Sequence, residues 1–151
     1  MKQNPVNIVS LNKTQKMELP RVNNQNVEAL LNREEIVRQT AEQIMKDFGM
    51  FGVEITFSGN IDRAYEELHQ QLIDQISGLI ERNYDLLLSV LYQVDITDRE
   101  IVRAQSELPH YSHIEIVAHQ VIARDLKKVL LRRYFKMKDA GNETDTSELK
   151  A

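Results

Sequence analysis

The sequence predicts an all-α protein: a helical bundle of about five helices with one short extended segment near residues 50–57. Three observations support this prediction. Apolar side chains recur at three- and four-residue steps, most clearly in residues 61–82. Two capping boxes, TDRE beginning at Thr97 and SHIE beginning at Ser112, each stand just before an apolar run. Few polar residues separate the runs, which indicates short connections between antiparallel neighbours.

The boundaries of each helix follow from caps and breakers. Asn32 is a suitable N-cap for the first helix, and Gly49 ends it. A second helix begins after Asn60 and runs to about Arg82, where an asparagine interrupts it. The later helices are YDLLLSVLYQV at residues 84–94, a helix from Thr97 to Leu108 before Pro109, and a last helix from Ser112 to about Met137.

Composition limits the domain organisation and the cell compartment. A chain of 151 residues is most simply one domain. We expect residues 1–27 to be a flexible arm, 28–138 the helical domain and 139–151 a disordered acidic tail. The chain has no cysteine, no apolar run of membrane-spanning length and no visible export signal. These features predict a soluble cytoplasmic protein without thiol chemistry.

The last predicted helix is apolar over more of its circumference than one covering surface requires. Ile114, Val121 and Leu126 belong to a broad apolar arc, which Val117 and Phe135 extend around the back. Such a helix is either the central helix of the bundle or partly covered by a second subunit. We favour the second alternative, and therefore expect a homo-oligomer.

The segment near residues 50–57 alternates apolar and polar residues in the manner of a β-strand. Its apolar members, Phe51, Val53, Ile55 and Phe57, are the predicted partner-binding residues. A strand needs a partner for its backbone, and three are available: the arm at residues 6–9, the same segment in another copy, or an extended segment of a different protein. Alternatively the segment is a loop whose phenylalanines plug the end of the bundle. In each case it covers apolar surface and does no chemistry.

The last helix also has a basic stripe. Seven lysines and arginines lie between residues 124 and 138, against one acid. Nucleic-acid phosphates, an anionic surface or an acidic protein could bind there, although the same charges also suit a helix C-terminus. A helix-turn-helix fits poorly, because its recognition helix would have no lysine or arginine before Arg124. The candidate anion-binding residues are Arg124, Lys128, Arg132, Arg133 and Lys136.

Histidines and carboxylates give weaker signals. Glu66 and His69 have the Glu-x-x-His spacing of carboxylate-bridged metal sites, but a second such element is lacking. The other match, Glu107 to His110, is interrupted by Pro109. His113 and His119 would lie nearly opposite each other on a helix and could not share an ion. We therefore expect no metal, no cofactor and no catalytic residues.

The stretches NYDLLLSVLYQVDITDREIV and VIARDLKKVLLRRYF resemble a set of small, uncharacterised, all-helical bacterial proteins. Those proteins pair a Leu-rich LLYxxDI helix with a final helix of mixed basic and apolar residues, and the resemblance covers roughly the last third of the chain. It implies an intracellular bacterial protein and no particular activity. The function we expect is non-catalytic protein–protein interaction, as an adaptor or regulatory subunit that self-associates. The alternative is a nucleic-acid-associated protein that contacts phosphates through the basic C-terminal helix.

Overall fold

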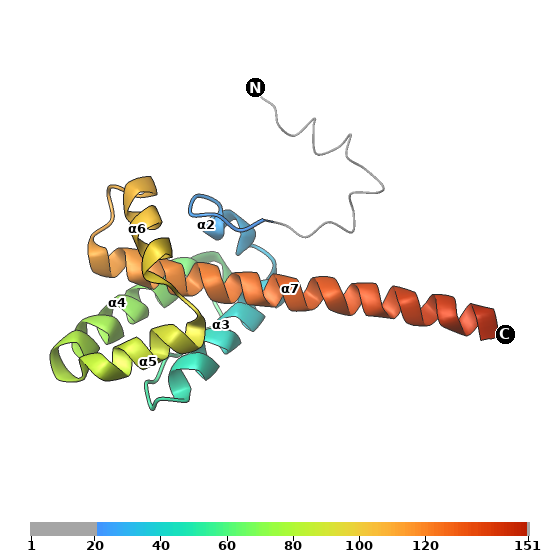
Figure 1. Cartoon of the computed structure of the whole chain (residues 1–151), viewed down its shortest axis with the longest axis horizontal. Helices are drawn as coiled ribbons and strands as arrows, with labels where there is room; N and C mark the ends of the chain where they lie inside the picture. Colours follow the sequence, from blue (N-terminus) through green and yellow to red (C-terminus); the bar gives the residue numbers. More distant parts are fainter. Residues whose placement is uncertain (1–20, 151) are drawn as a thin grey trace, which may run out of the picture. The chain divides into compact units, whose positions relative to one another are not determined.

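The computed structural model of this chain describes residues 21–150, with the side chains of residues 21–140, and in this part the all-α prediction is confirmed (Figure 1). The arm residues 6–9, a candidate strand partner, lie outside the described residues. Segment 50–57 forms no strand. The described elements are α2 (Val27–Leu30), α3 (Glu34–Gly49), the 3-10 turn η1 (Ile61–Arg63), α4 (Ala64–Arg82), α5 (Tyr84–Val94), α6 (Asp98–Glu107) and α7 (His113–Lys150).

Local capping chemistry sets most helix starts as predicted. Both halves of the Thr97 capping box are formed, and Ser112 exchanges the equivalent two bonds with Glu115. The Asn83 side chain accepts the Leu86 amide, which starts α5 at Tyr84 with only Asn83 between it and the end of α4. The Asn32 prediction is wrong, because α3 begins at Glu34 after a residue without a side-chain cap bond.

The two ends of the described chain are more regular than the sequence predicted. Part of the expected flexible arm is fixed, since Val27 starts α2 and its side chain is fully buried. At the other end α7 continues past Met137, through residues predicted to be a disordered tail, to Lys150. No proline stops the helix there, and Gly141 weakens it by only about 1 kcal/mol relative to alanine.

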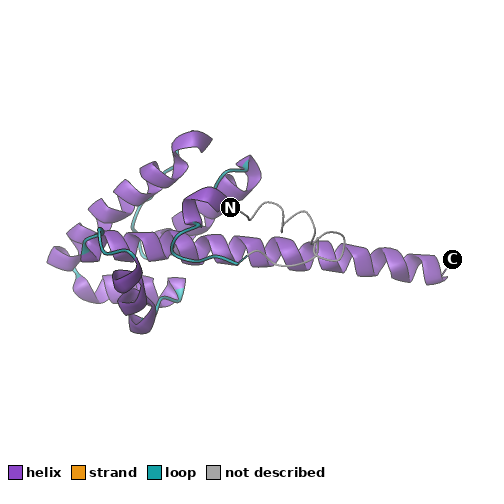
Figure 2. Ribbon diagram, turned by 90° about the horizontal axis from the view of Figure 1, so that it is seen from above, coloured by secondary structure: helices purple, strands orange, loops and turns teal. Residues whose placement is uncertain are grey.

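The first part of α7 is the central element of the compact unit formed by residues 22–129. Figures 1 and 2 show the other helices of this unit on more than one side of that part. The core of the unit includes Ile116, Val121, Ile122 and Leu126, all fully buried by the chain itself. The apolar side chains of residues 116–129 are therefore covered within the chain, as the central-helix alternative expects, whereas Phe135, which the sequence also placed in the apolar arc, is 53% exposed.

Residues 53–60 form no regular secondary structure, and several of their backbone groups bond to side chains instead of to another strand. Gly52, at a φ of +76°, turns the chain out of α3 in a conformation that favours glycine. Side chains at four-residue spacing on one face of α4 then bind the backbone of the segment, which removes the need for a strand partner on that edge. The bonds run from Gln71 to the Thr56 carbonyl (2.6 Å), from Gln75 to the Glu54 carbonyl (3.2 Å), from the Thr56 amide to Gln71 (3.0 Å) and from the Ser58 amide to Glu67 (2.8 Å).

Replacing Gln71 with methionine should therefore loosen this segment. Both Thr56 backbone groups lose their partner, and we expect a loss of about 1 kcal/mol in the free energy of unfolding, because water can replace part of the bonding. Hydrogen exchange should become faster at the Thr56 amide, while the Ser58 amide keeps its protection. Gln70→Met, on the exposed neighbouring position, is the matched control and should leave both amides unchanged; equal effects of the two variants would contradict the assignment.

Candidate functional site

The structure places the predicted partner-binding segment mostly inside the chain. The side chains of Val53 and Ile55 are buried, at 7% and 4% exposure, while Phe51 and Phe57 are half-buried. Val53 and Ile55 therefore belong to the core and offer no side-chain contact to a partner. Of the alternatives considered from sequence, a segment that covers the chain's own apolar surface fits these exposures best.

The basic stripe is not a continuous free surface. Arg124 donates to Asp95, which closes α5 in the left-handed conformation that aspartate tolerates better than most residues. Lys128 pairs with the buried carboxylates of Asp47 and Asp125, at 3.4 and 3.3 Å. Two of the five predicted anion-binding residues are thus engaged within the chain. Arg132 also has interactions of its own, so phosphate binding along the whole stripe would require these pairs to break.

The predicted histidine and carboxylate pairs have separate partners. Glu66 forms an exposed ion pair with Arg63, and His69 hydrogen-bonds the carbonyl of Glu115 at 3.0 Å. Glu66 and His69 thus take part in different contacts and do not form the metal-binding pair that their spacing suggested. The His113 ring bonds the Gln105 side chain at 2.8 Å, near the start of α7.

A chain of hydrogen bonds links two tyrosines, a histidine and the N-terminal segment. The carbonyl of Asn24 only accepts, so His119 Nε2 carries the proton in their 3.0 Å contact. His119 Nδ1 then accepts from the Tyr65 hydroxyl at 2.5 Å, and Tyr111 donates to the Tyr65 oxygen at 3.3 Å. Burial lowers the pKa of His119 to about 4, and burial likewise raises the pKa of Tyr65. Both groups are neutral at physiological pH, so this set of hydrogen bonds persists there. Through the bond of His119 to the Asn24 carbonyl, it holds segment 22–26 in place.

A charged cluster lies in the core where α3 meets α7. Asp47 and Asp125 are both buried, and Lys128 is their cation. Burial, and then the nearby charge of Asp47, raise the pKa of Asp125 to about 8, against a smaller opposing effect of Lys128. As a carboxylate, Asp125 would have only the 3.3 Å ion pair with Lys128 and no well-formed hydrogen bond, whereas as a carboxylic acid it can donate to Asp47. The cluster therefore contains one proton shared between Asp125 and Asp47, and an ion pair between Lys128 and the remaining negative charge.

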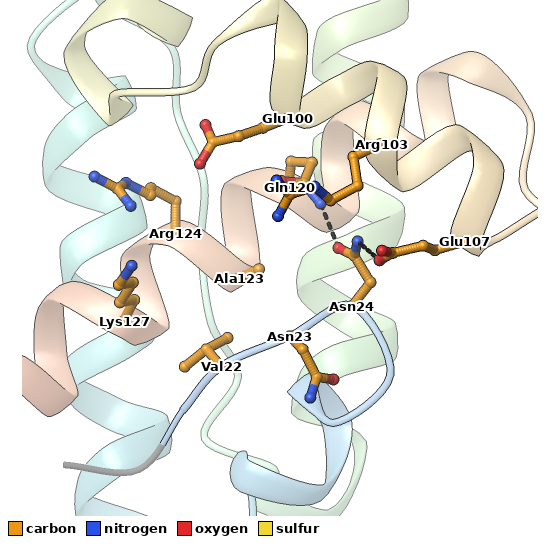
Figure 3. Close-up of a pocket in the computed structure, with 10 residues that line it drawn as sticks. All are labelled: Val22, Asn23, Asn24, Glu100, Arg103, Glu107, Gln120, Ala123, Arg124 and Lys127. Carbon is orange, nitrogen blue, oxygen red and sulfur yellow. Dashed lines mark hydrogen bonds between the residues drawn. The ribbon is translucent and has the colours of Figure 1, made fainter.

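A polar pocket of about 240 Å³ opens between the N-terminal segment, α6 and α7 (Figure 3). The segment is held there by Gln120, which donates to the Asn24 side chain at 2.6 Å, and by Glu107, which accepts from it at 2.6 Å. The charged side chains that line the pocket are those of Glu100, Arg103, Glu107, Arg124 and Lys127. Sequence reasoning missed this site because its residues come from three separate stretches. Of the lining residues, Arg124 had been predicted to bind an anion, and Glu107 had been considered only for its Glu-x-x-His spacing.

An apolar groove, also of about 240 Å³, lies between the end of α4, α5, α6 and the start of α7. Large apolar side chains that stay exposed on its walls are Ile80, Tyr84, Leu88 and Val102. Tyr92, one turn further along α5, is 86% exposed. The apolar composition of residues 84–94 was the sequence signal for this groove. The sequence alone did not distinguish the buried face of that helix from its exposed face.

No family model matches this chain, and neither a curated protein nor a solved structure shows significant similarity to it. Within the described residues, none of the helices combines the length and the apolar character that crossing a bilayer requires.

Proposed function

We propose that this protein is a non-catalytic interaction protein, an adaptor or regulatory subunit, and that its first partner is a second copy of itself. The observation that carries the proposal is the apolar face around the groove, defined here by Ile80, Tyr84, Leu88, Tyr92 and Val102. Single exposed apolar residues are normal on a soluble protein, but a contiguous group around a groove is typical of a binding surface.

The pattern of α5 supports a binding role for its exposed apolar side. Leu87 and Val90 face the core, and Asp85, Ser89 and Gln93 form a polar stripe at four-residue steps. A surface helix needs a polar face toward water, and this stripe provides it. Tyr84, Leu88 and Tyr92 form a second exposed stripe beside it, with 55%, 47% and 86% of their surfaces accessible. Core packing does not account for that second stripe, whereas a partner surface does.

A second copy is the occupant that the charges favour. The stripe of Tyr84, Leu88 and Tyr92 contains no charged residue. In a two-fold symmetric dimer the same patch meets itself, so a charged patch would oppose like charges, and an uncharged one does not. Exposed tyrosines also suit the centre of such an interface, because they bury a large area and lose little conformational freedom.

Sedimentation equilibrium of the full chain tests this proposal. We expect a mass that approaches twice 17.6 kDa as the protein concentration rises to about 0.1 mM. Leu88→Lys places a charge in the stripe and should return the mass to that of one chain. Because Leu88 is half-exposed, the variant should still fold.

The matched control is Ser89→Lys, which adds the same charge to the polar stripe of the same helix and should leave the dimer intact. A wild-type chain that stays monomeric over this concentration range would refute the dimer. Dissociation by both variants alike would indicate a general charge effect and would exclude the stripe as the interface.

A further inference from the structure

The polar pocket has more cationic donors than partners for them. Its two carboxylates, Glu100 and Glu107, already accept hydrogen bonds from neighbouring residues. Arg103 and Lys127 form no ion pair within residues 21–140. The donors to both carboxylates are uncharged, so the lining carries three cations against two carboxylates. Arg103 and Lys127 make no ion-pair contact with either carboxylate, which leaves their N–H groups open to an anion from outside.

Arg124 adds a third donor whose bonding is incomplete. Asp95 holds one end of its guanidinium, but its Nε is buried without an acceptor. Buried donors in folded proteins are nearly always paired, so an unpaired one indicates a missing acceptor. Figure 3 shows Arg124 and Lys127 on α7 and Arg103 on α6 around the same pocket, with Val22 and Asn23 on its edge.

We propose that this pocket binds a small hydroxylated organic anion, a phosphate monoester or a hydroxy acid. Arginine and lysine side chains pair strongly with the oxygens of either anionic group. The oxygens of Glu100 and Gln120 can accept from hydroxyl groups, and Val22 and Ala123 offer apolar contact to a short carbon chain. A volume of about 240 Å³ suits a ligand of this size. The site is separate from the apolar face proposed for self-association.

Isothermal titration of the full chain with glycerol 3-phosphate, malate and inorganic phosphate tests the assignment. Sodium chloride keeps the ionic strength constant, so that general charge effects cancel. We expect saturable binding of at least one of the two organic anions, and the probe that binds identifies the anionic group. The double variant Arg103→Gln/Lys127→Gln should bind about tenfold more weakly, the effect of losing charge-assisted bonds. Arg99→Gln, on the same helix but outside the pocket lining, should bind as the wild type does.

Two results would overturn the proposal: no saturable binding of any probe up to about 10 mM, or equal binding by the double variant and the wild type. Binding of inorganic phosphate alone would also contradict it, since the hydroxyl and apolar contacts would then contribute nothing.

The melting temperature of the double variant supplies an independent check. Without anion, the double variant should melt at or slightly above the wild-type temperature, because it removes two unpaired cations. A lower melting temperature would mean that these cations have structural partners.

Discussion

Replacing Lys128 with methionine should lower the free energy of unfolding by about 3 kcal/mol at pH 7. Methionine keeps the length and the apolar stem of lysine but removes the cation that pairs with the buried carboxylate of Asp47. A buried charge that loses its partner retains the full cost of desolvation, which is why the expected loss is large. A quarter of the Lys128 side chain is exposed, so we place the effect at the lower end of the usual range. Urea denaturation followed by circular dichroism measures it.

Two further variants separate the lost ion pair from a general effect of removing charge. Lys127→Met changes the neighbouring exposed lysine, which has no ion pair among the described residues, and should alter stability by less than about 0.5 kcal/mol. Adding Asp47→Asn to Lys128→Met removes the orphaned charge and should recover most of the loss. Equal losses for the two lysine variants would show that the ion pair does not stabilise the fold.

The Asp125→Asn variant should be more stable than the wild type at pH 8 and should lose this advantage as the pH falls to about 4. The pKa of Asp125 is about 8 in the folded chain and 3.8 in a solvent-exposed reference. Between these values the folded protein keeps a proton that the unfolded chain has released. Each unit of rising pH therefore favours unfolding by up to about 1.4 kcal/mol from this group. Asparagine carries no titrating proton and can still donate to Asp47.

The difference between the unfolding free energies of the variant and the wild type is the quantity to measure across this pH range, since other groups contribute equally to both chains. It should grow between about pH 4 and pH 8, and level off on either side. Asp62→Asn, at an exposed position in η1, is the control and should give no such growth. Parallel pH profiles for Asp125→Asn and the wild type would mean that Asp125 is ionised in the folded protein.

Local rules were sufficient to predict most helix boundaries. The capping boxes at Thr97 and Ser112 and the break at Asn83 all lie where the sequence placed them, because each depends on residues within one turn. Residues 50–57 were ambiguous for the opposite reason. Their alternation indicated a strand, but their backbone partner is a set of side chains on α4 up to 21 residues away.

The candidate sites could not be predicted from the sequence either, because they depend on how distant segments pack. A broad apolar arc on the last helix was visible, but whether this chain or a second one covers it depends on the packing of every other helix. The fold itself covers the apolar side chains of residues 116–129 and leaves the stripe of Tyr84, Leu88 and Tyr92 exposed. The polar pocket likewise joins residues as far apart as Asn24 and Gln120.

Residue patterns were sufficient to establish that this protein is helical, where most of its helices begin and end, and that it has no cysteine chemistry. Those properties follow from helical periodicity and from bonds within a single turn. The role of each charged residue, in contrast, depends on how the helices pack. Lys127 and Lys128 are neighbours in one basic run, yet Lys128 pairs with Asp47, 81 residues away, while Lys127 lines a pocket. Adjacent helical residues point about 100° apart, and the elements that pack on each side give them different roles.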